Sequence, residues 1–264
     1  MRSLLQTDFF DPPRPRVIAH RGASGDYPEN TLASFAAARD AGAPYLELDV
    51  HMSRDGVIVV AHDEDLARVA GNPAVIREND YAGLRTIDAG FNFKPPGTDA
   101  YPFRGKGIYV PTLAEVFAAC PEQLYIVEIK QADPSLAAPL LEVIVKAGMR
   151  RRVLIASEHQ RPIGEFRALA QDVPTNFPTP EIAAFLMALP PGAPPFTPRG
   201  DALQIPPTYQ GWKMVTPESV AAAHRIGAEV HVWTINDEHE MRAMLSLGVD
   251  GIITNFPARL QALI

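Results

Sequence analysis

One unit recurs along this 264-residue chain: a run typical of a helix, then a glycine, then a short apolar strand. It occurs at 36–50, 143–156, 220–233 and 244–254. Glycine readily adopts the left-handed conformation that ends a helix, so the chain turns directly into the next strand. Strands rich in Val, Ile and Leu that alternate with helices are typical of a parallel sheet covered by helices. The sequence therefore predicts an α/β fold.

The number of strands limits the choice of α/β architecture. Asp55-Gly56 is a strong hairpin signal, which predicts that 57–61 returns antiparallel on the strand before it. The remaining strands then suffice for a closed (β/α)8 TIM barrel. A doubly wound open sheet is the alternative, and it is less favoured because no G-x-G-x-x-G follows the first strand. The candidate strands are 16–20, 45–50, 57–61, 124–128, 152–156, 173–177, 201–205, 229–234 and 250–254.

Two stretches depart from this alternation. Residues 64–110 are rich in Gly, Pro and aromatic residues and show no clear period, and residues 189–200 are rich in proline. Loops of this length in compact domains are often lids or binding segments. The alternative is a tolerated surface insertion, which we favour for 189–200. We predict one barrel domain over 1–264 with an insertion at about 64–110, after the second strand and its hairpin.

Composition limits the classes of partner and the compartment. The net charge is −7 and the chain has no dense Lys/Arg run, which disfavours a nucleic-acid backbone as partner. The single cysteine, Cys120, excludes an intramolecular disulfide and fits a reducing compartment. No stretch has the length of a membrane span, and the first residues lack the apolar core of a signal peptide. We expect a cytoplasmic protein without stable membrane insertion.

The hairpin predicts a cluster of polar side chains. A two-residue turn at Asp55-Gly56 would place Asp49 opposite His62. Side chains alternate along a strand, so Glu47 and Asp49 share a face, and His62 is expected on that same face. In the "LYIVEIK" segment, Glu128 and Lys130 share a face at the end of another strand.

Catalytic groups of TIM barrels lie at the C-terminal ends of the strands, where His20, Glu47, Asp49, Glu128 and Lys130 are expected. Each has a structural alternative, because a lone histidine is usually a packed residue and Glu128 with Lys130 can form a simple ion pair. Three converging carboxylates, however, would repel one another and raise their own pKa values. One hard divalent cation removes that cost, and oxygen ligands favour Mg²⁺ or Ca²⁺.

Two histidines, a metal ion and two fixed cations suit phosphoryl transfer. One imidazole can accept a proton from the nucleophile while the other donates one to the leaving oxygen. Arg21 can bind two phosphoryl oxygens at once, whereas Lys130 acts as a point charge. The chain has no G-x-S-x-G elbow of a serine hydrolase and no P-loop.

These motifs resemble a known family. The segment "HRGASGDYPENTLASFAAARDAGAPYLELDVHMSRDGVIVVAHDEDLAR" closely resembles the N-terminal signature of glycerophosphodiester phosphodiesterases. The resemblance continues through "VPTLAEVF", "YIVEIK", "VHVWTIN" and "GVDGIITNFP" and covers nearly the whole chain. It implies a TIM barrel with a small insertion after the His62 motif. It also implies hydrolysis of a small-molecule glycerophosphodiester to an alcohol and sn-glycerol 3-phosphate with a divalent cation.

The resemblance also implies a role for each motif residue. His20 and His62 resemble the acid/base pair. Trp233 resembles an aromatic residue that lines the glycerol end of the substrate. Asn30 resembles a residue that positions the substrate, although it has an equally good interpretation as a helix cap. The metal ligands that the resemblance implies are Glu47, Asp49 and Glu128. The phosphate contacts that it implies are Arg21 and Lys130.

Three positions depart from the family pattern: the residues after Arg68, Glu158 after Ser157, and Asn255 where aspartate is frequent. We expect all three to lie outside the catalytic core and to affect the alcohol side of the pocket. The preferred head group, Mg²⁺ or Ca²⁺, the order of the histidines and the oligomeric state stay open.

Two other functions remain possible from the sequence. One is a lysophospholipase D, which needs an apolar channel for an acyl chain. The candidates to line such a channel are Phe91, Phe93, Tyr101 and Phe103. These residues equally suit a small core of the insertion. The other is a non-catalytic barrel that binds phosphodiesters. The presence of both histidines and all three carboxylates argues against it.

Overall fold

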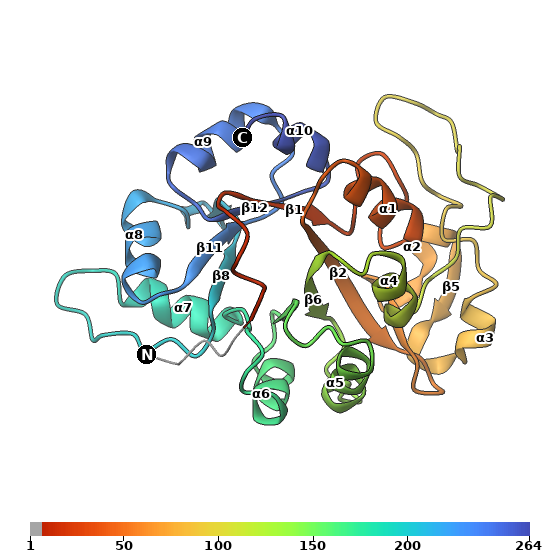
Figure 1. Ribbon diagram of the computed structural model, residues 1–264, viewed down its shortest axis with the longest axis horizontal. Helices are drawn as coiled ribbons and strands as arrows, with labels where there is room; N and C mark the ends of the chain where they lie inside the picture. The colour runs from red at the N-terminus through yellow and green to blue at the C-terminus, as the bar shows by residue number, and fades with distance from the viewer. Residues whose placement is uncertain (1–6) are drawn as a thin grey trace.

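The computed structural model describes residues 7–264, and its main sheet is parallel. The strand order is β7-β6-β2-β1-β12-β11-β8, so the first strand pairs with both the second and the last. Figure 1 shows these strands curving around a common centre with the helices outside them. The strands are β1 (Arg16–His20), β2 (Tyr45–Met52), β6 (Leu124–Ile129), β7 (Val153–Ala156), β8 (Ala202–Ile205), β11 (Glu229–Val232) and β12 (Gly251–Thr254).

The expected strand at 173–177 is reduced to single bridges, but these close the ring. Thr175 bridges to Ile155 of β7 and Asn176 bridges to Ala202 of β8, both in parallel. Pro174 has no N–H to donate to a ladder, which is a physical reason for the interruption. The seven paired strands and this segment occupy eight positions around the ring, so the expectation of a (β/α)8 barrel is confirmed.

The helices cover the outside of this ring. Thr31 and Thr216 each form a capping box with a serine three residues later, which satisfies backbone donors at the starts of α1 and α8. Among residues 7–264, no helix has both the length and the apolar character required to cross a bilayer. The helices are α1 (Leu32–Asp40), α4 (Leu113–Ala119), α5 (Ala137–Lys146), α6 (Gln160–Leu169), α7 (Thr179–Met187), α8 (Pro217–Arg225), α9 (Glu238–Ser246) and α10 (Pro257–Gln261).

The hairpin after β2 forms, but its predicted register is wrong by one residue. Strand β3 (Ile58–Val60) pairs antiparallel with β2, and Met52 faces Ile58. The loop contains three residues, and the last of them, Gly56, has a φ of 83°. A type I turn followed by a left-handed glycine accounts for the extra residue. Asp49 therefore faces Ala61 rather than His62, and the Ala61 N–H donates to the Asp49 carbonyl.

Residues after the hairpin form a compact insertion with short elements. Its apolar side chains pack together beside the barrel, and Leu66, Ile76 and Leu84 are fully buried. Figure 1 shows the long loop that follows α3 extending away from the strands. The single-domain organisation over 1–264 stays a prediction. The elements of the insertion are β4 (Asp65–Leu66), α2 (Ala67–Ala70), β5 (Asn72–Val75), the 3-10 helix η1 (Ile76–Glu78) and α3 (Tyr81–Leu84).

The N-terminal end of the barrel is filled by a buried ionic network. Arg16, which is 1% exposed, donates through Nε and Nη2 to both carboxylate oxygens of Glu229, at 2.8 and 2.7 Å. Its Nη1 donates to the Tyr45 hydroxyl at 2.6 Å. Phe9, also fully buried, packs on the ring of Tyr45. These contacts fill the end of the barrel at which the strands begin.

The C-terminal mouth is bordered by α7 and by a hairpin of β9 (Thr208–Tyr209) and β10 (Trp212–Lys213). The proline-rich residues 189–200 form neither helix nor strand, as expected. They are nevertheless packed, because the ring of Phe196 lies 5.6 Å from Phe177 and 5.8 Å from Phe185. This loop therefore supports α7 instead of being a mere surface insertion.

Candidate active site

The turn after β1 has an unusual backbone that positions His20 and Arg21. Arg21 has a φ of 54° and Gly22 a φ of 82°. A Cβ atom on Gly22 would lie 2.5 Å from Oγ of Ser34, so only glycine fits. Oγ of Ser34 donates to the Arg21 carbonyl at 2.9 Å. The cap of α1 thereby holds the turn in place, and this explains why a buried strand ends on "HRG".

His20 is the last residue of β1, and both of its ring nitrogens face polar groups. Nδ1 lies 2.6 Å from Oδ1 of Asn255, and Nε2 lies 4.0 Å from Oε2 of Glu47. Burial, followed by the charge of Arg21, lowers the pKa of His20 to about 4. The ring is therefore neutral at neutral pH, with Nδ1–H donating to Asn255 and Nε2 left as an acceptor.

Glu47, Asp49 and Glu128 converge at neighbouring strands. Each offers one carboxylate oxygen, and these three atoms lie within 4.8 Å of one another. Parallel pairing of β2 with β6 brings Asp49 beside Glu128 in register. The expected convergence is therefore present, and it follows from strand alternation in β2 together with that pairing.

Two cations flank the central carboxylate of this group. Nε of Arg21 lies 3.1 Å from Oδ2 of Asp49, and Nζ of Lys130 lies 3.3 Å from its Oδ1. Lys130 also donates to Oε1 of Glu128 at 2.7 Å. Despite the nearby ammonium, the buried Oδ1 of Asp49 accepts no hydrogen bond from any residue within 7–264. One carboxylate oxygen is thus left with unused capacity for a ligand.

The carboxylates differ in their affinity for protons. Burial, and then the charges of Asp49 and Glu128, raise the pKa of Glu47 well above its usual range. Burial also raises the pKa of Glu128 to about 7, although Lys130 opposes the rise. Burial acts in the same direction on Asp49, but Lys130 and Arg21 outweigh it and lower the pKa of Asp49. Without a cation between them, Glu47 and Glu128 therefore hold protons more tightly than usual, whereas Asp49 stays ionised.

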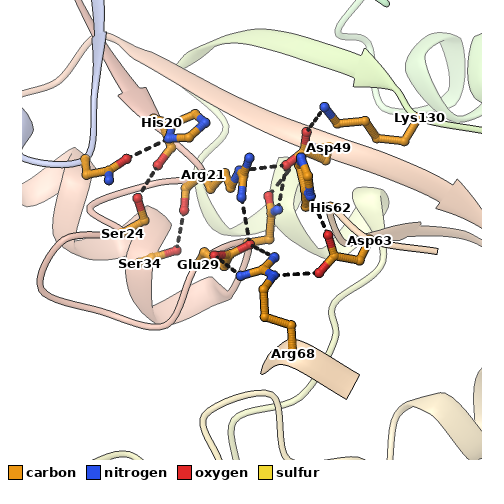
Figure 2. Close-up of polar contacts among 12 residues, drawn as sticks. His20, Arg21, Ser24, Glu29, Ser34, Asp49, His62, Asp63, Arg68 and Lys130 are labelled. Carbon is orange, nitrogen blue, oxygen red and sulfur yellow. Dashed lines mark hydrogen bonds and ion pairs between the residues drawn. The ribbon is translucent and has the colours of Figure 1, made fainter. Parts of the chain in front are cut away.

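His62 belongs to a chain of ionic contacts that sequence reasoning missed. Its Nδ1 lies 2.7 Å from Oδ1 of Asp63, whose Oδ2 accepts from Nε of Arg68 at 2.6 Å. Arg68 also binds Glu29 through both carboxylate oxygens, and Glu29 accepts from Arg21 at 3.0 Å. Figure 2 shows this chain running from His62 to Arg21 beside Asp49. The insertion thereby connects the two histidine motifs.

Asn30 contacts a carboxylate and does not cap a helix. The N-cap of α1 is Thr31, so the helix-cap interpretation of Asn30 is wrong. Asn30 is buried and has a φ of 56°, and its Nδ2 donates to Oδ2 of Asp49 at 2.8 Å. It therefore fixes the orientation of Asp49.

Both histidines open onto one cavity of about 700 Å³ at the C-terminal mouth of the barrel. Arg21, Lys130 and Trp233 also line it, together with Glu47 and Glu128. A volume of this size is typical of small-molecule sites. The residues that the sequence predicts at the site therefore meet in one place. Asp49 and Asn30 lie directly behind the residues that line the cavity.

One expectation about the cavity is wrong, and the insertion does not supply the apolar channel that the sequence left open. Asn255 contacts His20 directly, although we expected it to lie outside the core of the candidate site. The aromatic residues of the insertion do not line the cavity. Phe91 and Tyr101 stack against the Arg104 guanidinium, and Phe93 packs on Phe103. These side chains therefore pack on one another and on Arg104 at the surface of the insertion, where Phe91 and Tyr101 stay exposed.

Curated relatives match nearly all of this chain. A glycerophosphodiester phosphodiesterase of Bacillus altitudinis is 31% identical over 254 residues, which cover 92% of this chain and 96% of the relative. One of Caldanaerobacter subterraneus is 30% identical over 255 residues, with 94% and 97% covered. A lysophospholipase D of Mus musculus is 26% identical over 268 residues, with 93% and 85% covered.

Solved structures agree with the fold. The glycerophosphodiester phosphodiesterase of Agrobacterium tumefaciens is 25% identical with a TM-score of 0.77, and 94% of this chain and 99% of that chain are covered. A phosphodiesterase of Oleispira antarctica in complex with sn-glycerol-3-phosphate is also 25% identical, with a TM-score of 0.73 and 94% and 96% covered. The family model of the glycerophosphoryl diester phosphodiesterase family matches residues 20–259. This chain therefore belongs to the glycerophosphoryl diester phosphodiesterase family of hydrolytic enzymes.

Proposed function

We propose that this protein, acting as a single barrel domain, hydrolyses glycerophosphodiesters to an alcohol and sn-glycerol 3-phosphate. In this proposal Glu47, Asp49 and Glu128 hold one divalent cation, and His20 and His62 are the acid/base pair. The observation that carries it is the meeting of three carboxylates and two histidines in one cavity of the family's barrel. The complex of the Oleispira antarctica relative with sn-glycerol-3-phosphate supports the same product.

The donor set fits a hard cation. The three carboxylate oxygens lie within 4.8 Å of one another, and none of the described residues donates a hydrogen bond to Oδ1 of Asp49. The raised pKa values of Glu47 and Glu128 also fit, because a cation between these groups removes their repulsion. Mg²⁺ and Ca²⁺ prefer such all-oxygen sites. A bound ion would act as a Lewis acid on a phosphoryl oxygen and would lower the pKa of a bound hydroxyl.

The histidines supply proton transfer. His20 is neutral at neutral pH because its pKa is about 4, so Nε2 is available to accept a proton from the nucleophile. His62 is paired with Asp63, and a carboxylate on Nδ1 orients an imidazole whose Nε2 can donate to the leaving alcohol oxygen. We therefore propose His20 as the base and His62 as the acid of the first step.

Arg21 and Lys130 would bind the phosphate. Both cations lie within 3.3 Å of Asp49, so a phosphate placed at the carboxylate group would face them. Their charges would offset the negative charge that develops on the phosphoryl oxygens during the reaction. Trp233 lines the same cavity and would pack on the glycerol carbons.

A lysophospholipase D activity is the second candidate. The observation that favours it is the apolar part of the cavity, formed by α7 and the β9–β10 hairpin. The relative from Mus musculus carries that name. A non-catalytic phosphodiester-binding barrel is disfavoured, because all of the ionisable groups that the reaction needs line the cavity or lie behind it.

One assay separates these candidates. Glycerophosphocholine, glycerophosphoethanolamine and a lysophospholipid would be incubated with the protein, and the released alcohol measured with and without Mg²⁺ or Ca²⁺. Release from the first two substrates supports the main proposal. Binding of all three without any release would support the non-catalytic barrel.

We also propose that the protein acts in the cytoplasm. The single cysteine suits a reducing compartment, and it is buried in the barrel wall. Cell fractionation with detection of the native protein tests this, and recovery from an extracellular fraction would contradict it.

A further inference from the structure

A buried amide lies among apolar side chains on the floor of the cavity. The floor is formed by Ile126, Ala156, Gln204 and Ile253, which all line the cavity and are buried. The three apolar members belong to a core cluster that also contains Phe9 at the N-terminal end of the barrel. Gln204 is 8% exposed, and burial of an amide is unfavourable unless its polar atoms find hydrogen-bond partners. The partners of Gln204 therefore indicate what this floor is built to hold.

One end of this amide is used inside the barrel. Gln204 of β8 and His231 of β11 are register partners, and Nε2 of Gln204 lies 3.4 Å from Nδ1 of His231. Nε2 of His231 lies 3.0 Å from Oε2 of Glu229. A carboxylate can only accept, so the ring carries its proton on Nε2 and offers Nδ1 as an acceptor. The amide of Gln204 therefore directs its NH2 group at His231.

The ionic network beneath the floor holds this arrangement. Burial raises the pKa of Glu229, but hydrogen bonds from Arg16 and His231 outweigh burial and lower it to about 2, so the carboxylate is an ionised acceptor. His231 is fully buried. A Cβ atom on Gly251 would lie 3.0 Å from Cδ2 of His231, so glycine at this position leaves room for the ring. The acceptor for the NH2 group of Gln204 is thus fixed from below.

The other end of the amide is left for the cavity. Among residues 7–264, none donates a hydrogen bond to Oε1 of Gln204. Asn176, whose amide also lines the cavity, differs in this respect. Its Oδ1 accepts from the Ser157 N–H at 3.1 Å, and its Nδ2 donates to the Ser157 carbonyl at 3.3 Å. Gln204 therefore keeps an acceptor for a ligand that carries a hydroxyl or ammonium hydrogen.

Gln204 lies across the barrel from the carboxylates. In the ring of eight positions, β8 is four positions from β2 in either direction, and Figure 1 shows the two strands on opposite sides. A substrate whose phosphate is held near Asp49 would therefore have its buried part directed at Gln204. The leaving alcohol has to reach solvent through the mouth, so the part held on the floor is the glycerol. Trp233 agrees with this placement, because its N–H donates to the Ile205 carbonyl of β8 at 3.2 Å.

We propose that Gln204 determines specificity by accepting, through Oε1, a hydrogen bond from the terminal hydroxyl of the substrate's glycerol, and that His231 is the positioning residue for its amide. The terminal hydroxyl is the one on the carbon farthest from phosphorus. This inference rests on the proposed function and goes beyond it by assigning a residue to one atom of the substrate. A substrate with hydrogen at that carbon has no proton to donate and leaves the buried acceptor unpaired.

The first test compares glycerophosphocholine with an analogue that has hydrogen in place of the terminal hydroxyl. In the wild type we expect kcat/KM to be roughly ten- to a hundredfold lower for the analogue, because a buried acceptor stays unpaired. In Gln204→Met the two values should agree within about twofold, because the thioether has a similar length but accepts hydrogen bonds only weakly. Each ratio compares two substrates on one protein, so any loss of folded protein cancels.

The matched control for Gln204→Met is Gln261→Met, at an exposed glutamine on α10 that does not line the cavity. It should keep the wild-type ratio of the two kcat/KM values. A ratio near one in the wild type would overturn the proposal, and so would an undiminished ratio in Gln204→Met.

The second test addresses His231 through the same ratio. His231→Phe keeps an aromatic ring but removes the acceptor for the NH2 group of Gln204, so the amide is free to turn. We expect the preference for glycerophosphocholine over the analogue to fall toward one. A merely structural role would lower kcat/KM for both substrates equally and leave the ratio unchanged. An unchanged ratio would therefore overturn the role of His231.

The third test does not depend on turnover. Calorimetry with saturating Mg²⁺ or Ca²⁺ would compare the Kd of sn-glycerol 3-phosphate with that of its analogue lacking the terminal hydroxyl. The wild type should bind the first more tightly, and Gln204→Met should bind both alike. Equal Kd values in the wild type would overturn the proposal.

Two further outcomes of these assays separate the proposals. If Gln204→Met changes only the preference between glycerophosphocholine and glycerophosphoethanolamine, the acceptor faces the alcohol and the assignment to glycerol is overturned. Selective binding of sn-glycerol 3-phosphate without hydrolysis of any glycerophosphodiester would support the role of Gln204 and overturn the proposed function. Hydrolysis without any preference for the terminal hydroxyl would do the reverse.

Discussion

Nδ1 of His20 lies 2.6 Å from Oδ1 of Asn255, at the point where β1 and β12 lie side by side. The amide oxygen accepts the Nδ1 proton, so the neutral ring keeps Nε2 free on the side of Glu47. A neutral partner orients the ring but adds no negative charge that would stabilise its protonated form. In the proposed mechanism, Asn255 is therefore a positioning residue for the base His20.

Asn255→Asp should move the pH profile. The new carboxylate would stabilise the imidazolium and raise the pKa of His20 above its value of about 4. The acidic limb of kcat/KM reports protonation of the base in the free enzyme, so it should move to higher pH by about one unit or more. The measurement is kcat/KM against pH with saturating metal. If the acidic limb of kcat/KM lies at the same pH in the wild type and in Asn255→Asp, His20 is not the titrating base.

His20→Ala and His62→Ala should each lower kcat on glycerophosphocholine roughly a hundred- to ten-thousand-fold, as expected for loss of a general acid or base. Both variants should keep the wild-type circular dichroism and Tm, because both side chains lie at the cavity mouth. The matched control is His239→Ala, an exposed histidine on α9, which should keep wild-type kcat. Near-wild-type kcat in either site variant would refute the role of that histidine.

Glu229→Gln, a substitution at the N-terminal end of the barrel, should change the stability of the protein in acid. Burial raises the pKa of Glu229, but hydrogen bonds from Arg16 and His231 outweigh burial and lower it to about 2. Because the folded pKa lies below the usual value of 4.5, its stabilisation is complete above that value and is lost as pH falls toward about 2. The lowered pKa of Glu229 corresponds to roughly 3 kcal/mol of stabilisation of the folded state at neutral pH.

The measurement for Glu229 is urea unfolding at several pH values. We expect the wild type to lose free energy of unfolding between about pH 4.5 and pH 2 more steeply than Glu229→Gln. The variant should also be less stable at pH 7, because Arg16 is left buried without its carboxylate partner. If the free energies of unfolding of the wild type and of Glu229→Gln change with pH in parallel, Glu229 is not the source of this loss of stability in acid.

The substrate's own 2-hydroxyl should be the first nucleophile. It is held next to phosphorus, and a positioned group of this kind has a high effective concentration. One histidine takes its proton, the other protonates the departing alcohol, and water then opens the cyclic phosphate with the roles reversed. An analogue with hydrogen in place of the 2-hydroxyl should bind but lose kcat. Undiminished cleavage of that analogue would favour direct attack by water.

The strands of the barrel and most of the candidate site were predictable because alternation and strand ends are local properties. Glu47 and Asp49 share a face whatever the neighbouring strands do. The hairpin register was missed because a three-residue loop and a two-residue loop both accommodate Asp55-Gly56. His62 still reaches the site, because regular pairing in β3 ends at Val60 and the chain then leaves the strand.

The contacts that were not predicted join segments that are far apart in sequence. Asn255 meets His20 only because β12 closes the ring beside β1. The chain of contacts from Asp63 through Arg68 to Glu29 depends on irregular loops, and no periodicity marks their conformation. Similarly, Met187 and Trp212 belong to separate elements, and no local pattern places the two around one cavity.

The most direct test is metal-dependent release of choline from glycerophosphocholine. The protein would be stripped with EDTA, dialysed, and assayed alone and with added Mg²⁺ or Ca²⁺, beside an Asp49→Asn variant treated in the same way. We expect no release from the stripped wild type, recovery with at least one of the ions, and little recovery in the variant, whose central ligand has lost its charge. Full activity of the stripped wild type, or equal recovery in Asp49→Asn, would contradict the account.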